Sequence, residues 1–270
     1  MGVLNVTPDS FSDGGDFLTV DRAVERAREM ILEGAAIIDV GGASSRPKGK
    51  TYGEGAAVVS SEEEAMRVVP VISAVSAQHP DVWISVDTFS KDVAAKAIAA
   101  GAHMINDITG LRSDPRLADL AAAEKIPIIL MHSLGEPGLM PHGGDYGDVV
   151  AEVRRSLEES ISVAEARGAE QLIIDPGFGF GKSVDDNLRL MSTLNELTDL
   201  GFPVMVGVSR KSSIGAVLGG SNEPASIKNR LFGSLGVTAV AFLRGASIIR
   251  THDVGPTIDM LRAMTATLNA

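Results

Sequence analysis

Short apolar segments alternate with longer amphipathic segments along the whole chain. The apolar segments are rich in Val, Ile and Leu, which is typical of strands buried on both faces of a parallel sheet. They comprise residues 3–6, 36–40, 82–86, 104–108, 126–131, 172–174, 204–208 and 247–249. The segments between them carry apolar residues three and four positions apart, the spacing of an amphipathic helix. This spacing predicts helices over residues 20–32, 62–77, 93–100, 115–123, 149–166, 187–197, 224–243 and 257–268.

A Gly-Ala pair stands between a predicted helix and the next strand at four places. The pairs begin at Gly34, Gly101, Gly168 and Gly245. Glycine suits the left-handed position just beyond a helix, so the recurrence supports a series of βα units. Such units predict a parallel sheet covered by helices, and eight of them in 270 residues favour a closed TIM (β/α)8 barrel over an open Rossmann sheet. We expect one α/β domain over residues 1–270, with its active site at the C-terminal ends of the strands.

Composition narrows the class of protein. The net charge is −11, which argues against nucleic acid or an anionic membrane surface as a partner. The chain has no cysteine, which excludes disulfides, thiolate zinc sites and cysteine nucleophiles. No apolar run is long enough to cross a bilayer, and the N-terminus lacks the pattern of a secretory signal. We expect a cytoplasmic protein that concentrates its cations wherever it binds a small anion.

Polar or charged residues follow every predicted strand. A single Asp in such a place can simply cap the next helix, but eight polar strand ends favour a shared polar site at the mouth of the barrel. The cations come from the second, seventh and eighth loops, and the acids and amides come from the second, third, fourth and sixth strands. The cations are Arg46, Lys211, Arg250 and His252, and the acids and amides are Asp39, Asp87, Asn106 and Asp175.

This division by charge suggests a ligand with two unlike ends. Cations together with the amide oxygen of Asn5 suit a phosphate or diphosphate and its magnesium. Carboxylates and amides suit the edge of a heterocycle, because Asp accepts hydrogen bonds and Asn both donates and accepts them. The sequence therefore predicts one pocket for a heterocycle and an anion.

Three other kinds of binding site are not supported by the sequence. The glycines of residues 177–182 resemble a phosphate-binding loop, but Pro176 stands where that loop needs glycine. The third glycine of the same run comes one residue too early for a dinucleotide fingerprint. The histidines are scattered along the chain, so no zinc site is predicted.

Four motifs, taken in order, resemble the dihydropteroate synthase family. They are Asn-Val-Thr-Pro-Asp-Ser-Phe-Ser-Asp-Gly-Gly at residues 5–15, Asp-Pro-Gly-Phe-Gly-Phe-Gly-Lys at 175–182, Ser-Arg-Lys-Ser at 209–212 and Arg-Thr-His-Asp-Val at 250–254. The resemblance covers essentially the whole chain. It implies a homodimeric transferase of folate biosynthesis that uses magnesium and is a target of sulfonamides. The implied reaction condenses 6-hydroxymethyl-7,8-dihydropterin diphosphate with p-aminobenzoate, and it yields 7,8-dihydropteroate and pyrophosphate.

The same resemblance implies roles for individual residues. The residues expected at the pterin ring are Asp87, Asn106, Asp175, Lys211 and Arg250. Those expected at p-aminobenzoate are Ser45, Arg46, Pro47, Phe180, Lys211 and Ser212. Those expected at the diphosphate are Asn5, Arg46, Arg250 and His252, with Asn5 also holding Mg²⁺. The expected catalytic residues are Asp39, Asp175, Lys211, Arg250 and His252.

The resemblance also implies an order of chemical events. The pterin C–O bond breaks first and leaves a resonance-stabilised pterin cation. The arylamine then attacks this cation. Anions near the reacting carbon and cations near the departing pyrophosphate are the arrangement that such charge development needs.

The second loop departs from the family pattern Gly-Gly-Glu-Ser-Thr-Arg-Pro. Ala43 replaces Glu, Ser45 replaces Thr, and the loop then continues through a longer stretch at residues 48–55. Serine keeps the hydroxyl group, so we expect little effect from that change. The closure of the aminobenzoate pocket and the response to sulfonamides depend on this altered loop.

Two other functions are compatible with parts of the pattern. Pterin-dependent methyl transfer to a corrinoid protein accounts for Asp87, Asn106 and Asp175. It leaves Arg250, His252 and Ser212 without a role. A paralogue that binds pterin without turnover is suggested by the altered second loop. Release of pyrophosphate from the two substrates distinguishes the synthase from both.

Overall fold

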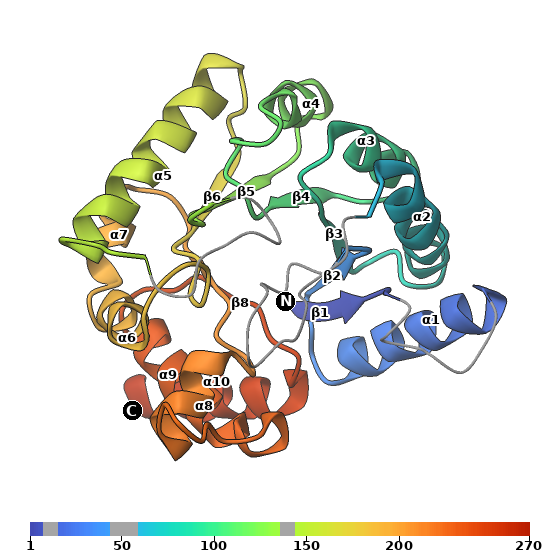
Figure 1. Cartoon of the computed structure of the whole chain (residues 1–270). Coiled ribbons are helices and arrows are strands. Elements are labelled where there is room, and N and C mark those ends of the chain that lie inside the picture. Colours follow the sequence, from blue (N-terminus) through green and yellow to red (C-terminus); the bar gives the residue numbers. More distant parts are fainter. Residues whose placement is uncertain (8–15, 44–58, 136–143) are drawn as a thin grey trace.

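The computed structural model describes residues 1–7, 16–43, 59–135 and 144–270. In these residues a ring of helices surrounds a central set of strands (Figure 1). The strands are β1 (Gly2–Asn5), β2 (Ile37–Gly41), β3 (Trp83–Asp87), β4 (Met104–Asp107), β5 (Ile128–Met131), β6 (Leu172–Asp175), β7 (Met205–Val206) and β8 (Ile248–Ile249). The helices are α1 (Asp16–Leu32), α2 (Ser61–Gln78), α3 (Lys91–Ala99), α4 (Arg116–Glu124), α5 (Val149–Ala166), α6 (Val184–Ser192), α7 (Asn195–Thr198), α8 (Ser212–Gly219), α9 (Leu231–Leu243) and α10 (Val254–Leu268).

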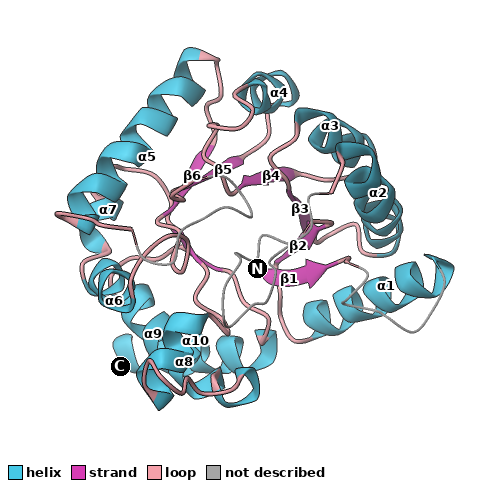
Figure 2. Ribbon diagram, in the orientation of Figure 1, coloured by secondary structure: helices cyan, strands magenta, loops and turns pink. Residues whose placement is uncertain are grey.

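The strands close into a barrel, which Figure 2 shows inside the helices. Strands β1 to β6 form one parallel sheet in chain order, and β7 pairs with β8 in parallel. Parallel bridges join Ile174 to Val204 and Gly2 to Thr251. They connect β6 to the start of β7, and the end of β8 back to β1. The predicted (β/α)8 barrel is confirmed.

The strands are buried on both faces, and the two faces differ. Side chains alternate between the faces of a strand. One set points outward and packs beneath the helices in the main hydrophobic core, with members that include Leu4, Ile38, Val40, Ile84, Val86, Ile105, Leu130 and Ile174. The other set points into the barrel, where a separate apolar cluster is formed by Met104, Ile129, Ile173 and Met205. We call this cluster the interior plug.

One step further along the same strands, the inward side chains become polar. Asn106 follows the plug residue Met104 by two positions, and Asp175 follows Ile173 by two positions. Because side chains on one face of a strand recur every second residue, both polar groups face into the barrel beyond the plug. The same parity and strand register apply to Asp39, Asp87 and Arg250. A polar layer therefore lies at the C-terminal mouth of the barrel.

Helix ends follow the signals in the sequence. Ser60 caps α2 by accepting a hydrogen bond from the backbone N–H of Glu63 at 3.2 Å. Ser183 and Asp186 form a reciprocal capping box at the start of α6. The four glycines between helices and strands all have positive φ, as predicted for Gly34, Gly101, Gly168 and Gly245.

Three helical segments differ from the prediction. The predicted helix at 187–197 is divided into α6 and α7, and the one at 224–243 starts only at Leu231, after a 3-10 turn at Ile227–Asn229. Helix α8 was not predicted. It has eight residues and contains glycines, which lower helix propensity, so its sequence has little helical periodicity.

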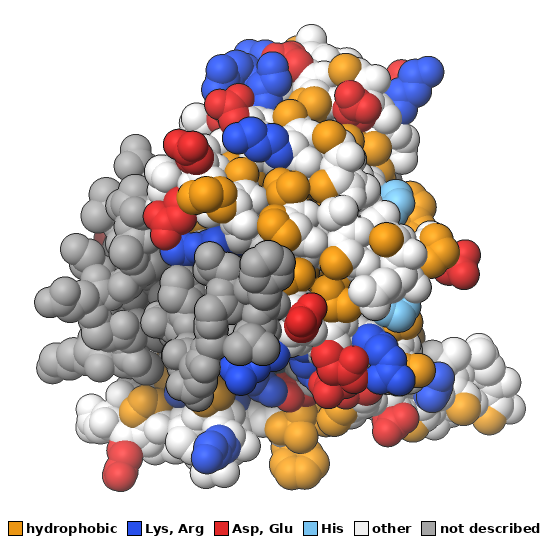
Figure 3. Space-filling view, turned by 90° about the vertical axis from the view of Figure 1, so that its right-hand side faces the viewer, with side chains coloured by type: hydrophobic (Ala, Val, Ile, Leu, Met, Phe, Trp, Pro, Cys, Tyr) orange, Lys and Arg blue, Asp and Glu red, His pale blue; other side chains and the backbone are white. Residues whose placement is uncertain are grey.

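The outer surface mixes charges of both signs. Figure 3 shows Lys and Arg side chains interspersed with Asp and Glu on one side of the barrel. Exposed i,i+3 pairs on α1, such as Arg28 with Glu25, contribute to this pattern. Among the described residues, no helix has both the length and the apolar character needed to cross a membrane.

The interior plug predicts a large effect from one core substitution. Ile129 is fully buried in the plug, so Ile129→Ala should lower the free energy of unfolding by about 2–5 kcal/mol. Ile129→Val keeps most of the volume and should cost only about 0.5–1.5 kcal/mol. Urea denaturation followed by circular dichroism measures both. Equal stability of Ile129→Ala and the wild type would mean that the plug is not tightly packed.

Candidate active site

The polar layer at the barrel mouth contains a buried network around Arg250. Its Nε donates to Oδ2 of Asp39 at 2.6 Å, and its Nη2 donates to Oδ2 of Asp87 at 2.8 Å. Asn106 Nδ2 donates to the same Asp39 oxygen at 3.1 Å. Asp39 is completely buried, and the Arg250 side chain is only 19% exposed. The sequence had assigned Arg250 to a cationic half of the pocket, but its guanidinium lies between two carboxylates.

This network has electrostatic consequences for Asp87. Burial raises the pKa of Asp87 to about 7, while Arg250 opposes the rise and the Asp39 carboxylate adds to it. The two carboxylates in turn raise the pKa of Arg250, so its guanidinium stays charged. One arginine thus balances two buried acids.

Two acceptor atoms of the network have no partner within the described part of the chain. They are Oδ1 of Asp39 and Oδ1 of Asn106, and both are buried. Buried polar atoms in folded proteins normally have hydrogen-bond partners. An unpartnered acceptor at a pocket therefore indicates a place where a ligand N–H can bind.

Asp175 and Lys211 form a second charged group at the same mouth. The Gly177 N–H donates to Oδ1 of Asp175 at 2.7 Å. Burial raises the pKa of Asp175 to about 6, which the Gly177 bond and the cations Lys211 and Arg250 oppose. Burial lowers the pKa of Lys211 to about 8, helped by Arg250 and opposed by Asp175 and Asp87. Asp175 ends β6, and Lys211 and Arg250 follow β7 and β8, so all three lie at the C-terminal mouth that the sequence predicted.

Phe180 lies against Lys211. The Lys211 Nζ is 3.8 Å from the centroid of the Phe180 ring, a cation–π contact. Phe180 is half-buried, so part of its ring remains open to a ligand. An aromatic face next to an ammonium group suits an aromatic carboxylate.

The glycines before Phe180 allow a backbone conformation that other residues would not adopt. Gly177 and Gly179 have φ of 68° and 81°. A Cβ on Gly177 would lie 1.8 Å from the carbonyl oxygen of His132, and one on Gly179 would lie 3.1 Å from Cδ of Lys211. Only glycine permits these approaches, which explains a glycine-rich run that is neither a P-loop nor a dinucleotide fingerprint.

Lys182 is buried beneath this loop. Its Nζ donates to the carbonyl oxygens of Gly177 at 2.9 Å and Phe180 at 3.1 Å. Burial lowers the pKa of Lys182 to about 7, and Asp175 opposes that shift. The loop thus folds around the end of a lysine side chain. No role for Lys182 follows from the sequence, because lysine is usually exposed and nothing local signals its burial.

The loop after β7 presents Lys211 to the mouth. Arg210 has a positive φ of 61°, a conformation that costs energy for a residue with a side chain. It is held by Arg230 Nη1, which donates to the Arg210 carbonyl at 3.0 Å, and by Ser234 Oγ, which accepts from its N–H at 3.1 Å. The Arg210 side chain pairs with Asp253 through Nε at 3.0 Å.

The residues after Lys211 begin α8. Lys211 is the N-cap residue and Ser212 is the first helical residue. The predicted position of Ser212 at a helix N-terminus is therefore confirmed. The backbone N–H groups at that end favour an anion.

His252 lies at the same mouth as a neutral ring. Its Nδ1 is 3.1 Å from Oγ of Ser209, which also accepts from the His252 N–H at 3.2 Å. Burial lowers the pKa of His252 to about 3, and the nearby Arg250 and Arg210 add to the effect. His252 was grouped with the cations in the sequence, but at neutral pH it offers hydrogen bonds without a charge.

The remaining predicted residues divide into two groups. Asn5 ends β1, is half-buried and pairs in register with Gly41 of β2. Ser45, Arg46 and Pro47 lie outside the described residues. No group of three or more His, Asp or Glu side chains that could hold a metal occurs among residues 1–7, 16–43, 59–135 and 144–270. A magnesium ion held mainly by substrate oxygens and a single amide oxygen, such as that of Asn5, is compatible with this donor set.

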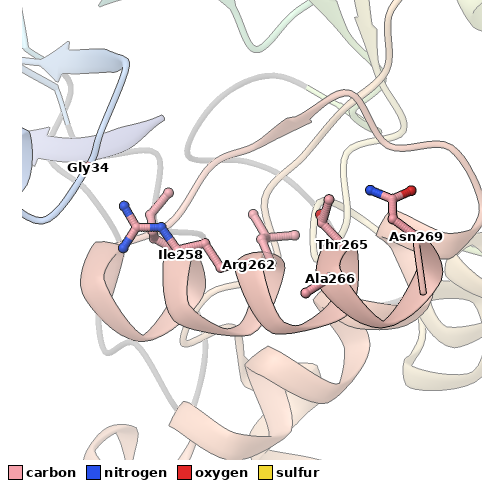
Figure 4. Close-up of a pocket in the computed structure, with 7 residues that line it drawn as sticks. Gly34, Ile258, Arg262, Thr265, Ala266 and Asn269 are labelled. Carbon is pink, nitrogen blue, oxygen red and sulfur yellow. The ribbon is translucent and has the colours of Figure 1, made fainter.

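A shallow groove elsewhere on the molecule does not belong to this site. It runs along α10 and includes Gly34, Ile258 and Arg262 (Figure 4). Gly34 precedes β2, so the groove lies toward the opposite end of the barrel from the mouth. The residues that line it are Gly34, Ile258, Leu261, Arg262, Thr265, Ala266 and Asn269.

Comparison with known proteins gives consistent matches. The family model described as "Pterin binding enzyme" matches residues 1–252. The dihydropteroate synthase of Escherichia coli (strain K12) is 47% identical over 273 residues, covering 100% of this chain and 92% of that protein. The dihydropteroate synthase of Bacillus subtilis (strain 168) is 42% identical over 271 residues, covering 100% of this chain and 88% of that protein.

Solved structures agree with the sequence matches. A structure of Xanthomonas albilineans dihydropteroate synthase with 4-aminobenzoic acid is 44% identical with a TM-score of 0.90, covering 100% of this chain and 93% of that chain. A Yersinia pestis dihydropteroate synthase in a sulfonamide drug complex is 43% identical with a TM-score of 0.88, covering 100% and 94%. The similarity in fold therefore extends over the whole chain.

The Arg250 network predicts a pH-dependent loss of stability. Arg250→Met leaves the Asp39 and Asp87 carboxylates without their cation, and the pKa of Asp87, already raised by burial, moves further above its unfolded value. The variant should lose about 3–5 kcal/mol at pH 8, and the deficit should shrink at pH 5, where protonation removes the uncompensated charge. Urea unfolding at both pH values measures the difference.

Arg210→Met is the matched control for this prediction. Arg210 pairs with Asp253 near the surface, with 42% of its side chain exposed. It should therefore cost only about 0–1 kcal/mol, with little dependence on pH over this range. A deficit of Arg250→Met that is the same at pH 5 and pH 8 would contradict the proposed charge balance.

Proposed function

Since the chain belongs to the dihydropteroate synthase family of pterin-binding enzymes, we propose that it condenses 6-hydroxymethyl-7,8-dihydropterin diphosphate with p-aminobenzoate. The products are 7,8-dihydropteroate and pyrophosphate, and the enzyme is a transferase. The observation that carries this conclusion is the 47% sequence identity with a dihydropteroate synthase over the whole chain. The barrel mouth, where acids lie beside cations, is consistent with it. Residues 1–270 act as a single domain.

The buried acids and amide bind the pterin ring in this proposal. The ring edge presents amino and ring N–H groups, which need acceptors. Oδ1 of Asp39 and Oδ1 of Asn106 are buried and unpartnered within the described structure. The carboxylates of Asp87 and Asp175 add further acceptors, and Lys211 supplies a donor. This side of the mouth is complementary to the edge of a pterin.

The diphosphate end is bound by Asn5, Arg46, Arg250 and His252. A guanidinium has five N–H donors, and the network uses only two of them on Asp39 and Asp87. The remaining donors of Arg250 and the neutral ring of His252 are available to phosphate oxygens. A magnesium ion held by Asn5 and the diphosphate, when bound, would supply charge neutralisation for the leaving group.

Catalysis follows from the position of the charges. When the pterin C–O bond breaks, both electrons leave with pyrophosphate and positive charge develops on the pterin. The carboxylates of Asp39 and Asp175 stabilise that cation, and Arg250 and His252 stabilise the departing anion. The p-aminobenzoate nitrogen then forms the C–N bond and loses a proton. Fixed charges of this kind need little reorganisation in the transition state.

The aminobenzoate lies beside Phe180 and Lys211. Their contact forms one wall of the pocket, and Ser212 at the start of α8 faces the carboxylate. A helix N-terminus and an ammonium group together favour that anion. Ser45, Arg46 and Pro47, which lie outside the described residues, are further p-aminobenzoate-binding residues in this proposal, and sulfonamides would compete with that substrate.

We also propose that the enzyme is a cytoplasmic homodimer. Large apolar side chains are exposed on and between α8 and α9, a patch formed by Val217, Leu218, Ile227, Phe232, Val240 and Leu243. Exposed apolar side chains on neighbouring elements are a common feature of protein interfaces. The cytoplasmic location is a prediction from the sequence.

Substitutions at the two central charged groups test the function. Asp175→Asn and Lys211→Met keep size but remove charge, and each should lower pyrophosphate release by roughly 10²-fold or more. Circular dichroism should remain that of a folded barrel. Lys228→Met, an exposed lysine outside the mouth, should keep wild-type turnover. Wild-type rates in either mouth variant would exclude the assigned roles, and no pyrophosphate release by the wild type would exclude the synthase function.

The apolar patch yields a separate prediction. Phe232 is 83% exposed, and Phe232→Glu should convert the dimer to a monomer in analytical ultracentrifugation, because a charge would be buried at the interface. Leu268→Glu, at an exposed leucine on α10 outside the patch, should leave the dimer intact. A wild-type monomer, or a dimer unaffected by Phe232→Glu, would rule out this interface.

A further inference from the structure

Asn187 has a polar side chain buried at the junction of two site loops. It lies in the first turns of α6 and is completely buried. Asparagine is mostly exposed in proteins, and a buried amide needs several partners. The sequence analysis gave this residue no role.

Both the oxygen and the nitrogen of the Asn187 side-chain amide form hydrogen bonds. Its Oδ1 accepts from the Gly179 N–H at 2.7 Å. Its Nδ2 donates to Oγ of Ser213 at 3.1 Å and to the carbonyl of Ser183 at 2.7 Å, and lies 3.3 Å from the carbonyl of Lys182. One side chain thus joins the loop after β6 to the start of α8.

The two joined segments carry the opposite sides of the aminobenzoate pocket. Gly179 directly precedes Phe180, and Ser213 directly follows Lys211 and Ser212. Lys211 Nζ in turn lies 3.8 Å from the Phe180 ring centroid. A shift of either segment would change the spacing between the aromatic wall and the start of α8.

Helix α6 does not depend on Asn187 for its own start. Ser183 Oγ accepts from the Asp186 N–H at 3.1 Å, and the Asp186 carboxylate accepts from the Ser183 N–H at 3.3 Å. This capping box satisfies the N–H groups of Ser183 and Asp186 without Asn187. The bonds of Asn187 to Gly179 and Ser213 reach outside the helix, so they connect segments rather than cap one.

We propose that Asn187 is a positioning residue for p-aminobenzoate, which sets the distance between Phe180 and Ser212 by holding both segments through one buried amide. The proposal rests on the proposed synthase function. Apart from Lys211, which the two substrates share, the residues of the pterin end lie on β2, β3, β4, β6 and β8 or directly after them, and no hydrogen bond in the described structure links them to Asn187. Its loss should therefore affect the second substrate more than the first.

Steady-state kinetics with both substrates test the proposal. In Asn187→Leu the KM for p-aminobenzoate should rise about tenfold, as expected for the loss of one to two net hydrogen bonds. The kcat should stay within about threefold, and the Kd of the pterin diphosphate from calorimetry within about twofold. Asn187→Asp keeps the acceptor for Gly179 but loses the donors, so its KM should lie between those of the wild type and Asn187→Leu.

Two further variants keep the test decisive. Ser213→Ala removes only the bond to α8 and should raise the KM for p-aminobenzoate about threefold, with no additional effect in the Asn187→Leu background. Val75→Ala removes buried volume beneath α2, far along the barrel from this pocket, and should lower stability without changing KM.

The outcomes separate the two proposals. An inactive wild type would overturn the synthase function itself. An active wild type whose KM for p-aminobenzoate is unchanged in Asn187→Asp and Ser213→Ala would overturn the positioning role. The positioning role would also be overturned if Val75→Ala raised the KM for p-aminobenzoate as much as Asn187→Leu does at the same loss of stability. In that case lost stability alone would explain the change in KM.

Discussion

Three carboxylates are buried at one end of this barrel, and they can be buried there only because cations lie among them. Removing a charge from water costs several kcal/mol unless a partner compensates it. Arg250 bridges Asp39 and Asp87, while Lys211 and Lys182 offset Asp175. Burial still raises the pKa of Asp87 and Asp175 and lowers that of Lys211 in the presence of these partners. The fixed charges at the mouth are thus only partly balanced by one another.

In the proposed function, the reaction uses this arrangement of charges. A substrate that develops positive charge on its ring and negative charge on its leaving group completes the balance during bond cleavage. The unpartnered acceptors on Asp39 and Asn106 extend this idea to hydrogen bonding, because each can accept an N–H from a ligand. Protein stability is reduced by such groups, and transition-state stabilisation is gained from them.

The polar network is held by backbone geometry that supplies no chemistry itself. Gly177 and Gly179 adopt positive φ so that the loop can approach His132 and Lys211 closely. Lys182 fills the loop from below, and Arg230 with Ser234 holds Arg210 in its left-handed conformation. These residues lie behind the functional side chains and fix where Phe180 and Lys211 stand.

The sequence by itself determined the eight strands, most of the helices, the polar strand ends and the family, because strand and helix periods and local motifs are properties of consecutive residues. It also predicted that Asp39, Asp87, Asn106, Asp175, Lys211 and Arg250 share one site, and the structure places them at the same end of the barrel. Only the tertiary structure decided that Arg250 lies between two acids, that His252 is neutral, and that Lys182 and Asn187 are buried. Pairing and burial depend on residues that are distant in the chain, such as Arg250 and Asp39. The loss of water around these side chains shifts their pKa values, and it cannot be read from a local sequence pattern.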